Sequence, residues 1–347
     1  MIINLERILK LKLKDIAELA DVSTATVSRV INNKAGVKDE VRKKVKKVIK
    51  ENNYTPNLMA RGLASQKSNA IGLVIPKYAD FYADLVNSII KYCSQQEYRV
   101  IITTSTGQLE ENKDNLNMLY QSQVEGIIYC VARMTDEKKK ILQKINQELP
   151  IVSLNQDIAD LDIPAVLSDN YTGTVKAVEY LINKGHQRIA FIKPHHHDPE
   201  GQKRFSAYQN AMHNQQLKIP ESYLQESDYS IESGYQAMQD IVEQAEILPT
   251  AVLGANDHTA IGAINYLQEH DFLVPEDISV MGIDDIKIAK YYNPKLTTIR
   301  QELSAMGQEA VKLLFEYIAN PDLKAKKLVM DQKLIIRDSV KKINEKK

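Results

Sequence analysis

Short polar side chains and one arginine follow several apolar segments of the chain, and their chemistry is that of a carbohydrate site. They come after candidate strands, and they are Phe81, Tyr82, Asp169, Asn170, Arg204, Asn256, Asp257, Asp284 and Asp285. Carboxylate and amide groups bind vicinal hydroxyls, while an aromatic ring offers a flat face to a sugar. These residue types predict a site for a small polyhydroxylated molecule. We expect Asp257 to cap the helix that follows it rather than to contact a ligand.

A second set of residues, near the start of the chain, has the pattern that duplex DNA requires. Residues 15–31, DIAELADVSTATVSRVI, predict two short helices with a tight break between them and Ser23 as the cap of the second. The second helix turns Val27, Val30 and Ile31 inward. Its outer face carries Thr24, Ala25, Thr26, Ser28 and Arg29. Hydroxyls bind phosphates, arginine binds guanine and alanine contacts a thymine methyl, so this segment predicts a helix-turn-helix.

The charge of the chain is distributed unevenly. Residues 1–67 carry 15 basic and 7 acidic side chains, whereas the other 280 residues carry 30 and 38. Many of the basic residues fall in a third predicted helix: Arg42, Lys43, Lys44, Lys46 and Lys47. The chain thus has a basic N-terminal region, residues 1–67, which we call the head, and an acidic remainder. This distribution favours a polyanionic partner for the head, and a solvated charged helix is the alternative interpretation.

Other chemistries are disfavoured. Asp284 and Asp285 are adjacent and cannot flank one glycosidic bond, and no nucleophile–base pair or phosphate loop is found, so we expect no enzyme activity and no cofactor. Consecutive histidines at 195–197 do not converge on a metal, so we expect a mobile loop and no metal site. The chain has two cysteines without a CxxC motif, no secretory signal and no run of about 18 apolar residues. These features predict a cytoplasmic protein without membrane contact.

The elements that would position the polyol site begin at residue 70. Apolar strands alternate with amphipathic helices, and the strands are expected at 71–75, 100–103, 126–130, 151–154, 165–167, 189–192, 251–254 and 278–282. Helices are expected near 82–96, 109–122, 135–147, 171–184, 201–215, 232–244, 257–270 and 302–319. This alternation predicts an α/β fold with two doubly wound parallel sheets, and a closed eight-fold barrel is the competing topology. Ligands of open sheets bind beyond the carboxyl ends of the strands.

Several sequence blocks resemble the lactose-repressor (LacI/GalR) family of bacterial transcription regulators. They are KLKDIAELADVSTATVSRVINN, NYTPNLMARGLASQKSNAIGLVIP, SDNYTGTVKAVEYLINKGHQRIAFI, YSIESGYQAM, PTAVLGANDHTAIGA, VPEDISVMGIDD and PKLTTIRQ. Together they cover residues 13 to about 340 in the family's order and spacing. Asp21 stands where most members have glycine in the inter-helix turn, and Asp tolerates a left-handed conformation. Lys38 replaces a usual serine cap, and Ala207 a frequent glycine.

The resemblance implies a role for individual residues. Base reading is implied for Thr24, Ala25 and Arg29, phosphate contact for Ser23, Thr26, Ser28 and Asn32, and minor-groove insertion of a hinge helix for Ala60 and Leu63. The effector-binding positions implied are Phe81, Tyr82, Asp169, Arg204, Tyr229, Asn256 and Asp284.

The resemblance also implies an organisation and a mechanism. We expect a DNA-binding domain at 13–56, a hinge helix and linker at 57–68, and an effector-binding and dimerisation domain at 69–347. Its two periplasmic-binding-protein-like lobes are expected at about 69–168 with 300–330, and at about 169–299 with 331–343. A homodimer would bind a pseudo-palindromic operator, and a small molecule between the lobes would act through the hinge. A sugar is the favoured effector, a purine or a phosphoprotein co-regulator is also open, and a periplasmic-type sugar-binding protein without DNA function is the alternative.

Overall fold

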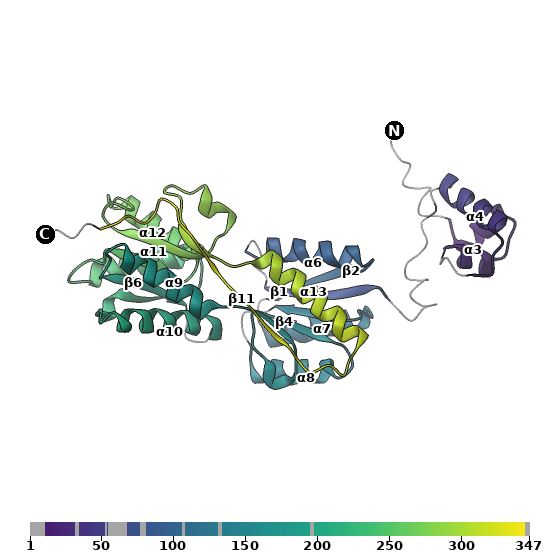
Figure 1. Ribbon diagram of the computed structural model, residues 1–347, viewed down its shortest axis with the longest axis horizontal. Coiled ribbons are helices and arrows are strands. Elements are labelled where there is room, and N and C mark those ends of the chain that lie inside the picture. The colour runs from purple at the N-terminus through teal and green to yellow at the C-terminus, as the bar shows by residue number, and fades with distance from the viewer. Residues whose placement is uncertain are drawn as a thin grey trace. The chain divides into compact units, whose positions relative to one another are not determined.

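The chain forms two compact units, residues 1–68 and residues 69–347. The computed structural model describes residues 11–31, 35–52, 54, 68–76, 81–105, 108–130, 134–194 and 198–343 (Figure 1). Within these ranges, every helix is too short or too polar to span a lipid bilayer.

In its described residues, the first unit is a bundle of three helices. They are α2 (Leu13–Leu19), α3 (Thr24–Ile31) and α4 (Asp39–Glu51). Their apolar faces meet in a small core that includes Ile16, Val27, Val30 and Val45. The turn between α2 and α3 has Asp21 at a φ of +50°, so this residue does adopt the left-handed conformation that glycine would favour.

The second unit contains two six-stranded sheets, which confirms the predicted fold class and excludes a closed barrel. The first sheet has the order β11-β5-β4-β3-β1-β2 and is parallel throughout. Its strands are β1 (Ala70–Pro76), β2 (Arg99–Ser105), β3 (Ile127–Cys130), β4 (Ile151–Leu154), β5 (Ala165–Ser168) and β11 (Lys327–Met330). Its helices are α6 (Ala83–Gln95), α7 (Leu109–Gln121), α8 (Asp136–Asn146) and α13 (Leu303–Ala319). Helices α6 and α13 pack in one apolar core of this lobe, and α7 and α8 in another.

The second sheet has the order β12-β10-β9-β8-β6-β7, and only its β10–β12 pair is antiparallel. Its strands are β6 (Ile189–Pro194), β7 (Leu224–Ser227), β8 (Ala251–Gly254), β9 (Ser279–Asp284), β10 (Thr297–Arg300) and β12 (Lys333–Ile335). Its helices are α9 (Asn170–Asn183), α10 (Pro199–Asn214), α11 (Ile231–Gln244) and α12 (Asp257–Glu269). Short 3-10 turns lie at Ala159–Leu161, Glu221–Tyr223 and Lys287–Lys290.

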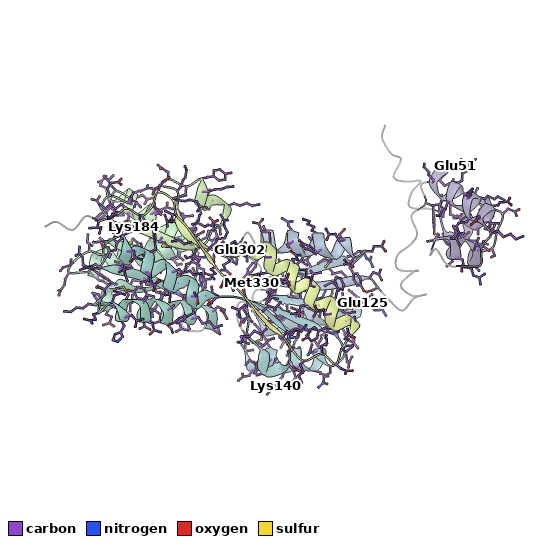
Figure 2. All side chains as sticks on the ribbon, in the orientation of Figure 1. Glu51, Glu125, Lys140, Lys184, Glu302 and Met330 are labelled. Atoms are coloured by element: carbon purple, nitrogen blue, oxygen red, sulfur yellow. The ribbon has the colours of Figure 1, made fainter. Side chains whose placement is uncertain are left out.

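The chain passes between the two sheets three times. The passages follow β5, β10 and β11, so each lobe is built from separate stretches of sequence. Glu302 and Met330, labelled in Figure 2, lie at the second and third passages. In a parallel sheet, the side chains that follow the strands gather at the carboxyl edge of the sheet. The three passages bring the carboxyl edges of the two sheets together.

The eight predicted strands all occur, but β7, β10, β11 and β12 were missed. These four segments read LQES, TTIR, KLVM and KLI, and they lack the continuous apolar run by which the other strands were recognised. The sequence therefore predicts too few strands for the second sheet, and it omits edge strand β11 of the first sheet.

Candidate functional site

Helix α3 exposes the side chains that were predicted to read bases. Thr24, Ala25 and Arg29 are exposed, whereas Val27 and Val30 are buried in the core of the bundle. Small exposed residues allow the helix surface to come close to a partner, and Arg29 adds one cation with several hydrogen-bond donors. The helix therefore has the two faces that groove entry requires.

The predicted phosphate contacts lie at the start of the same helix. The Ser23 hydroxyl accepts the backbone N–H of Thr26 at 3.1 Å, so the expected N-cap is present, and it also bonds the Thr26 hydroxyl at 2.9 Å. Ser28 is half-buried on the next turn. Asn32, Ala60, Leu63 and the predicted hinge helix lie outside the described residues.

Helix α4 presents the basic side chains of the head. Lys43, Lys44, Lys46 and Lys47 are exposed, and Val45 between them is buried. Lys38 precedes the helix without a side-chain cap, while Asp39 and Glu40 lie in its first turn. Their negative charges lie near the positive end of the helix dipole, where they stabilise the helix.

A cavity of about 740 Å³ lies where the carboxyl ends of the two sheets meet. Six of the seven predicted effector positions line it: Phe81, Tyr82, Arg204, Tyr229, Asn256 and Asp284. The other lining residues include Asn155, Gln156, Asn170, Asp198, Glu200, Asp228, Glu232, His258 and Gln301. The cavity has the size and mixed polarity of a small-molecule site.

Arg204 is a buried side chain of this cavity with several hydrogen-bond partners. It is 7% exposed, and its Nε and one Nη donate to the Asn170 side-chain oxygen at 3.1 and 3.0 Å. The other Nη donates to the Ala255 carbonyl at 2.5 Å, and a longer 3.5 Å contact reaches Asp284. Burial opposes the charged guanidinium, but the carboxylates around it outweigh burial and raise the pKa of Arg204.

Asp284 ends strand β9 in an unusual backbone conformation. Its φ is +120° and that of Asp285 is +58°. Residues other than glycine rarely adopt such positive values, and two in succession are more unusual still. The Asp284 carboxylate accepts Gln301 Nε2 at 2.7 Å, and burial raises its pKa although Arg204 opposes the rise. Asp285 has other partners and accepts hydrogen bonds from Arg300 Nε at 2.6 Å and from Arg337 at 2.5 Å. Two arginines of the neighbouring strand regions thus hold this bend in place.

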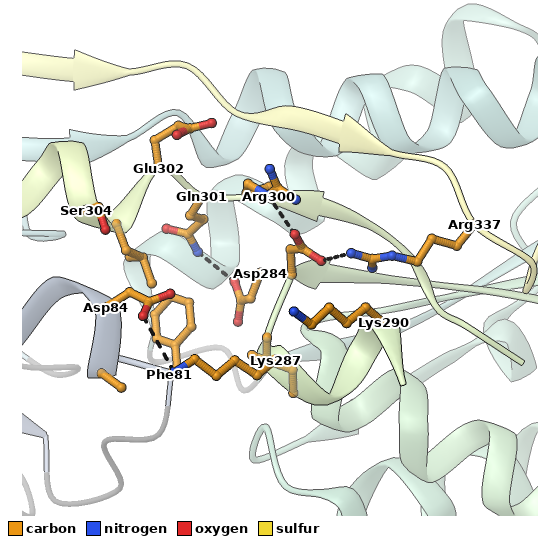
Figure 3. Close-up of a pocket in the computed structure, with 14 residues that line it drawn as sticks. Phe81, Asp84, Asp284, Lys287, Lys290, Arg300, Gln301, Glu302, Ser304 and Arg337 are labelled. Atoms are coloured by element: carbon orange, nitrogen blue, oxygen red, sulfur yellow. Dashed lines mark hydrogen bonds and ion pairs between the residues drawn. The ribbon is translucent and has the colours of Figure 1, made fainter. Parts of the chain in front are cut away.

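A second cavity, of about 360 Å³, is lined by Asp285 as well as by Asp284. Figure 3 shows the side chains around it. Lys287 of one lobe and Asp84 of the other form a 3.9 Å ion pair there, and both side chains are mostly exposed. Gln301 and Asp284 line both cavities. The hydrogen bond between them therefore lies in the wall that the two cavities share.

Two helix caps change the interpretation of individual residues. The predicted effector position Asp169 accepts the backbone N–H of Thr172 at 3.0 Å and caps α9, and Asn170 takes its place in the cavity lining. The prediction that Asp257 caps α12 was wrong, because Asn256 accepts the Thr259 N–H at 2.8 Å. Asp257 is fully buried and accepts hydrogen bonds from Ile286 N at 2.8 Å and from the Thr298 hydroxyl at 2.5 Å.

Aromatic residues approach the cavity from both lobes. Phe81 and Tyr82 meet edge to face with ring centroids 4.8 Å apart. Tyr229 comes from the other lobe with a φ of +72°; its hydroxyl donates to Asp198, and its carbonyl accepts Asn256 Nδ2 at 3.1 Å. These two contacts fix a tyrosine in a conformation that is rare for a bulky residue.

Sequence reasoning missed several lining residues. Asn170 lies two residues after β5, and the sequence places it among the strand-end residues but not among the effector positions. Gln301 follows the missed strand β10, and Glu200 opens α10 after a loop, so neither ended a recognised strand. In the described part of the chain, no cluster of His, Cys, Asp and Glu residues could hold a metal ion. The three histidines at 195–197 lie outside that part.

Comparisons with known proteins give the family. The model for bacterial regulatory proteins of the lacI family matches residues 12–57, and the model for the periplasmic binding protein-like domain matches residues 178–340. The chain is 32% identical over 329 residues to the ribose operon repressor of Haemophilus influenzae, covering 94% of this chain and 98% of that protein. It is 32% identical over 333 residues to the transcriptional repressor PurR of Vibrio campbellii, with coverages of 96% and 99%. It is 33% identical over 337 residues to a probable transcriptional repressor, ExuR, of Bacillus subtilis, with coverages of 95% and 98%.

Solved structures agree with these relatives. The lac repressor dimer bound to operator and the anti-inducer ONPF aligns with a TM-score of 0.87 at 28% identity, covering 95% of this chain and 99% of that chain. The regulator CelR in complex with cellobiose aligns with a TM-score of 0.73 at 27% identity, with coverages of 95% and 100%. The head is basic and has three described helices, and a polar cavity lies between two doubly wound lobes. Because the chain also matches these repressors over nearly their whole length, it belongs to the lacI family of bacterial regulatory proteins, which are DNA-binding transcriptional repressors.

Proposed function

We propose that this repressor binds a pseudo-palindromic operator as a homodimer, and that a sugar in the cavity between the lobes either weakens or strengthens operator binding. The observation that carries the proposal is the convergence of six predicted effector residues, from both sheets, on one cavity. A ligand that contacts both walls has a different affinity for each relative angle of the lobes, and a difference of about 1–3 kcal/mol changes operator affinity roughly 5- to 150-fold.

The DNA contacts follow from the exposed face of α3. Thr24, Ala25 and Arg29 would read bases, and the residues Ser23, Thr26, Ser28 and Asn32 would contact phosphates. Ala60 and Leu63 would enter the minor groove from a hinge helix that forms on DNA.

A homodimer is supported by exposed apolar side chains at the edge of the first sheet. Ile102 on edge strand β2, Ile90 on α6, and Met118 and Tyr120 on α7 are each at least 41% exposed. A second copy covering this edge would remove them from water, and twofold symmetry of the protein would match a palindromic site.

A sugar effector is supported by the lining and by the relatives. Asn256, Asp284 and Gln301 supply amide and carboxylate groups, while Phe81 and Tyr82 supply aromatic faces. Two of the similar proteins are named for sugars, as a ribose operon repressor and a regulator in complex with cellobiose.

The test is operator binding by the full chain, with and without sugars. Genomic fragments selected by the protein are measured by fluorescence anisotropy with wild type and Arg29→Ala. We expect Arg29→Ala to weaken operator binding by about 1–3 kcal/mol and to leave binding to random DNA nearly unchanged. Equal losses on both DNAs would refute base reading by Arg29, and a protein that selects no fragment would refute the proposed function.

A further inference from the structure

The charges that line the cavity between the lobes are strongly unbalanced. Among the lining residues that the structure describes, five carry carboxyl groups, and they are Asp198, Glu200, Asp228, Glu232 and Asp284. The described lining residues of the other sign are Arg204 and the weak base His258. A concave site lined mainly by carboxylates has a negative potential, which attracts cations and repels anions.

Arg204 has little capacity left for an anionic ligand. Its guanidinium has five N–H donors, and four contacts direct them to the Asn170 side chain, the Ala255 carbonyl and Asp284. The side chain is also 7% exposed. One N–H of the guanidinium has no assigned contact among the described residues, so a carboxylate or phosphate that entered the cavity would have to break some of these bonds to form a bidentate pair with Arg204.

Two buried lining atoms are acceptors without a hydrogen-bond partner among the described residues. They are Asn155 Oδ1, in the first lobe, and Gln301 Oε1, at the second passage. Gln301 is 5% exposed, and its Nε2 is occupied by Asp284, so its free oxygen has a defined orientation. A buried acceptor without a partner is unfavourable, and a hydroxyl or amine donor of a ligand would satisfy it.

We infer that the effector is a polyhydroxylated molecule that carries an amino group or no charge, and that sugar acids and sugar phosphates are excluded. The inference rests on the proposed function, because it takes this cavity as the effector site. Hydroxyl and ammonium groups are donors and match the free acceptors, whereas an added carboxylate or phosphate brings only acceptors and a charge that the lining repels.

The test uses calorimetry to measure how tightly the full-length protein binds four forms of each of three hexoses. The glucose, galactose and mannose series are each measured as parent sugar, 2-amino sugar, uronate and 6-phosphate. In the series that binds, we expect the parent or the amino sugar to bind at least about tenfold more tightly than either anion. Tightest binding of a uronate or a phosphate would overturn the inference, as would the absence of binding in all three series.

A pair of double variants tests whether the lining charge is the cause. Asp228→Asn with Glu232→Gln removes two exposed lining carboxylates, while Asp240→Asn with Glu243→Gln removes two from α11 outside the lining. The first variant should reduce the discrimination against the uronate by about fivefold or more, and the second should leave it unchanged. Equal effects of both variants would contradict a local cause. Operator binding without effector is measured for each protein, so that a failure of the proposed function is distinguished from a failure of this inference.

Discussion

The two lobes contribute opposite kinds of chemistry to the same cavity. Among the described residues, the first lobe supplies Phe81, Tyr82, Asn155 and Gln156, none of which is charged. The second lobe supplies Arg204, His258 and all five carboxyl groups, and a buried hydrogen-bond network around Asn170 holds Arg204, Asp284 and Glu200. One wall is therefore an aromatic and amide surface, and the other is a charged, preorganised one.

This difference suggests a division of labour. Charged groups that are already fixed by neighbours can bind hydroxyls without ordering new side chains, so the second lobe is suited to bind the effector first. The first lobe then closes with apolar surface, which adds binding free energy only when the lobes approach each other. The angle between the lobes would thus depend on the uncharged wall, and affinity mainly on the charged one.

Removing the arginine of the charged wall should have the largest effect. Arg204→Ala leaves Asp284 and Asn170 without their partner in a buried site, so we expect a loss of about 3–5 kcal/mol in the unfolding free energy of residues 69–347. Urea denaturation of the full chain measures it. The control is Lys203→Ala, because Lys203 is 42% exposed in its pair with Glu200 at 2.7 Å and should change stability by about 1 kcal/mol or less. Similar small losses for both variants would mean that the wall is not preorganised.

The carboxylate of the same wall should dominate effector affinity. Asp284→Asn keeps the shape of the side chain and removes its charge, and we expect effector binding to weaken by about 1.5–3 kcal/mol. Calorimetry gives the affinity, and anisotropy should show that operator binding without effector is unchanged. A normal effector response in this variant would remove Asp284 from the site.

The uncharged wall should contribute less. Phe81→Ala removes one ring of the edge-to-face pair, and effector affinity should fall by about 1 kcal/mol, with little dependence on salt. Phe81→Leu separates the two properties of the ring, because it retains apolar contact and loses the flat face. If both variants bind like wild type, the first lobe does not contact the effector.

The smallest expected effect concerns the pH dependence of the charged lobe. Burial, with Asp284 nearby, raises the pKa of Asp257 well above its usual range. Since the unfolded chain has the ordinary value of about 3.9, this residue's contribution to stability is complete below that pH and is lost as pH rises through the raised value. Asp257→Asn should therefore give a shallower decline in unfolding free energy between about pH 5 and 8. An unchanged slope would show that Asp257 does not titrate in that range.

The same contrast between walls determines what the sequence could predict. Phe81, Tyr82 and Asp284 follow strands with long apolar runs, and such strands could be recognised, so the positions of these residues at a sheet edge followed from periodicity. Gln301 follows Thr297–Arg300, a strand too short and polar to be recognised, and its hydrogen bond with Asp284 depends on a chain passage that no local pattern reveals.

Caps were a further source of error. Asp169 and Asn170 are neighbours with similar chemistry, and only the backbone geometry at the start of α9 decides which of them caps the helix and which faces the cavity. The same competition between Asn256 and Asp257 was resolved in favour of Asn256. The same residue types, Asp and Asn, cap helices and line binding sites. The sequence alone does not distinguish the two roles, and tertiary contacts are needed to do so.

The threefold passage of the chain between its sheets has a consequence for synthesis on the ribosome. The core of the head is complete by Tyr54, but the core of the first lobe requires residues of α13, from Leu303 to Tyr317. At about 5–20 residues per second, translation needs roughly 10–50 s to supply that helix after the head has emerged. A growing or truncated chain therefore carries a finished head on a lobe whose apolar face is still uncovered, and a release event shortly before Leu303 would yield a product that lacks the last layer of its own regulatory domain.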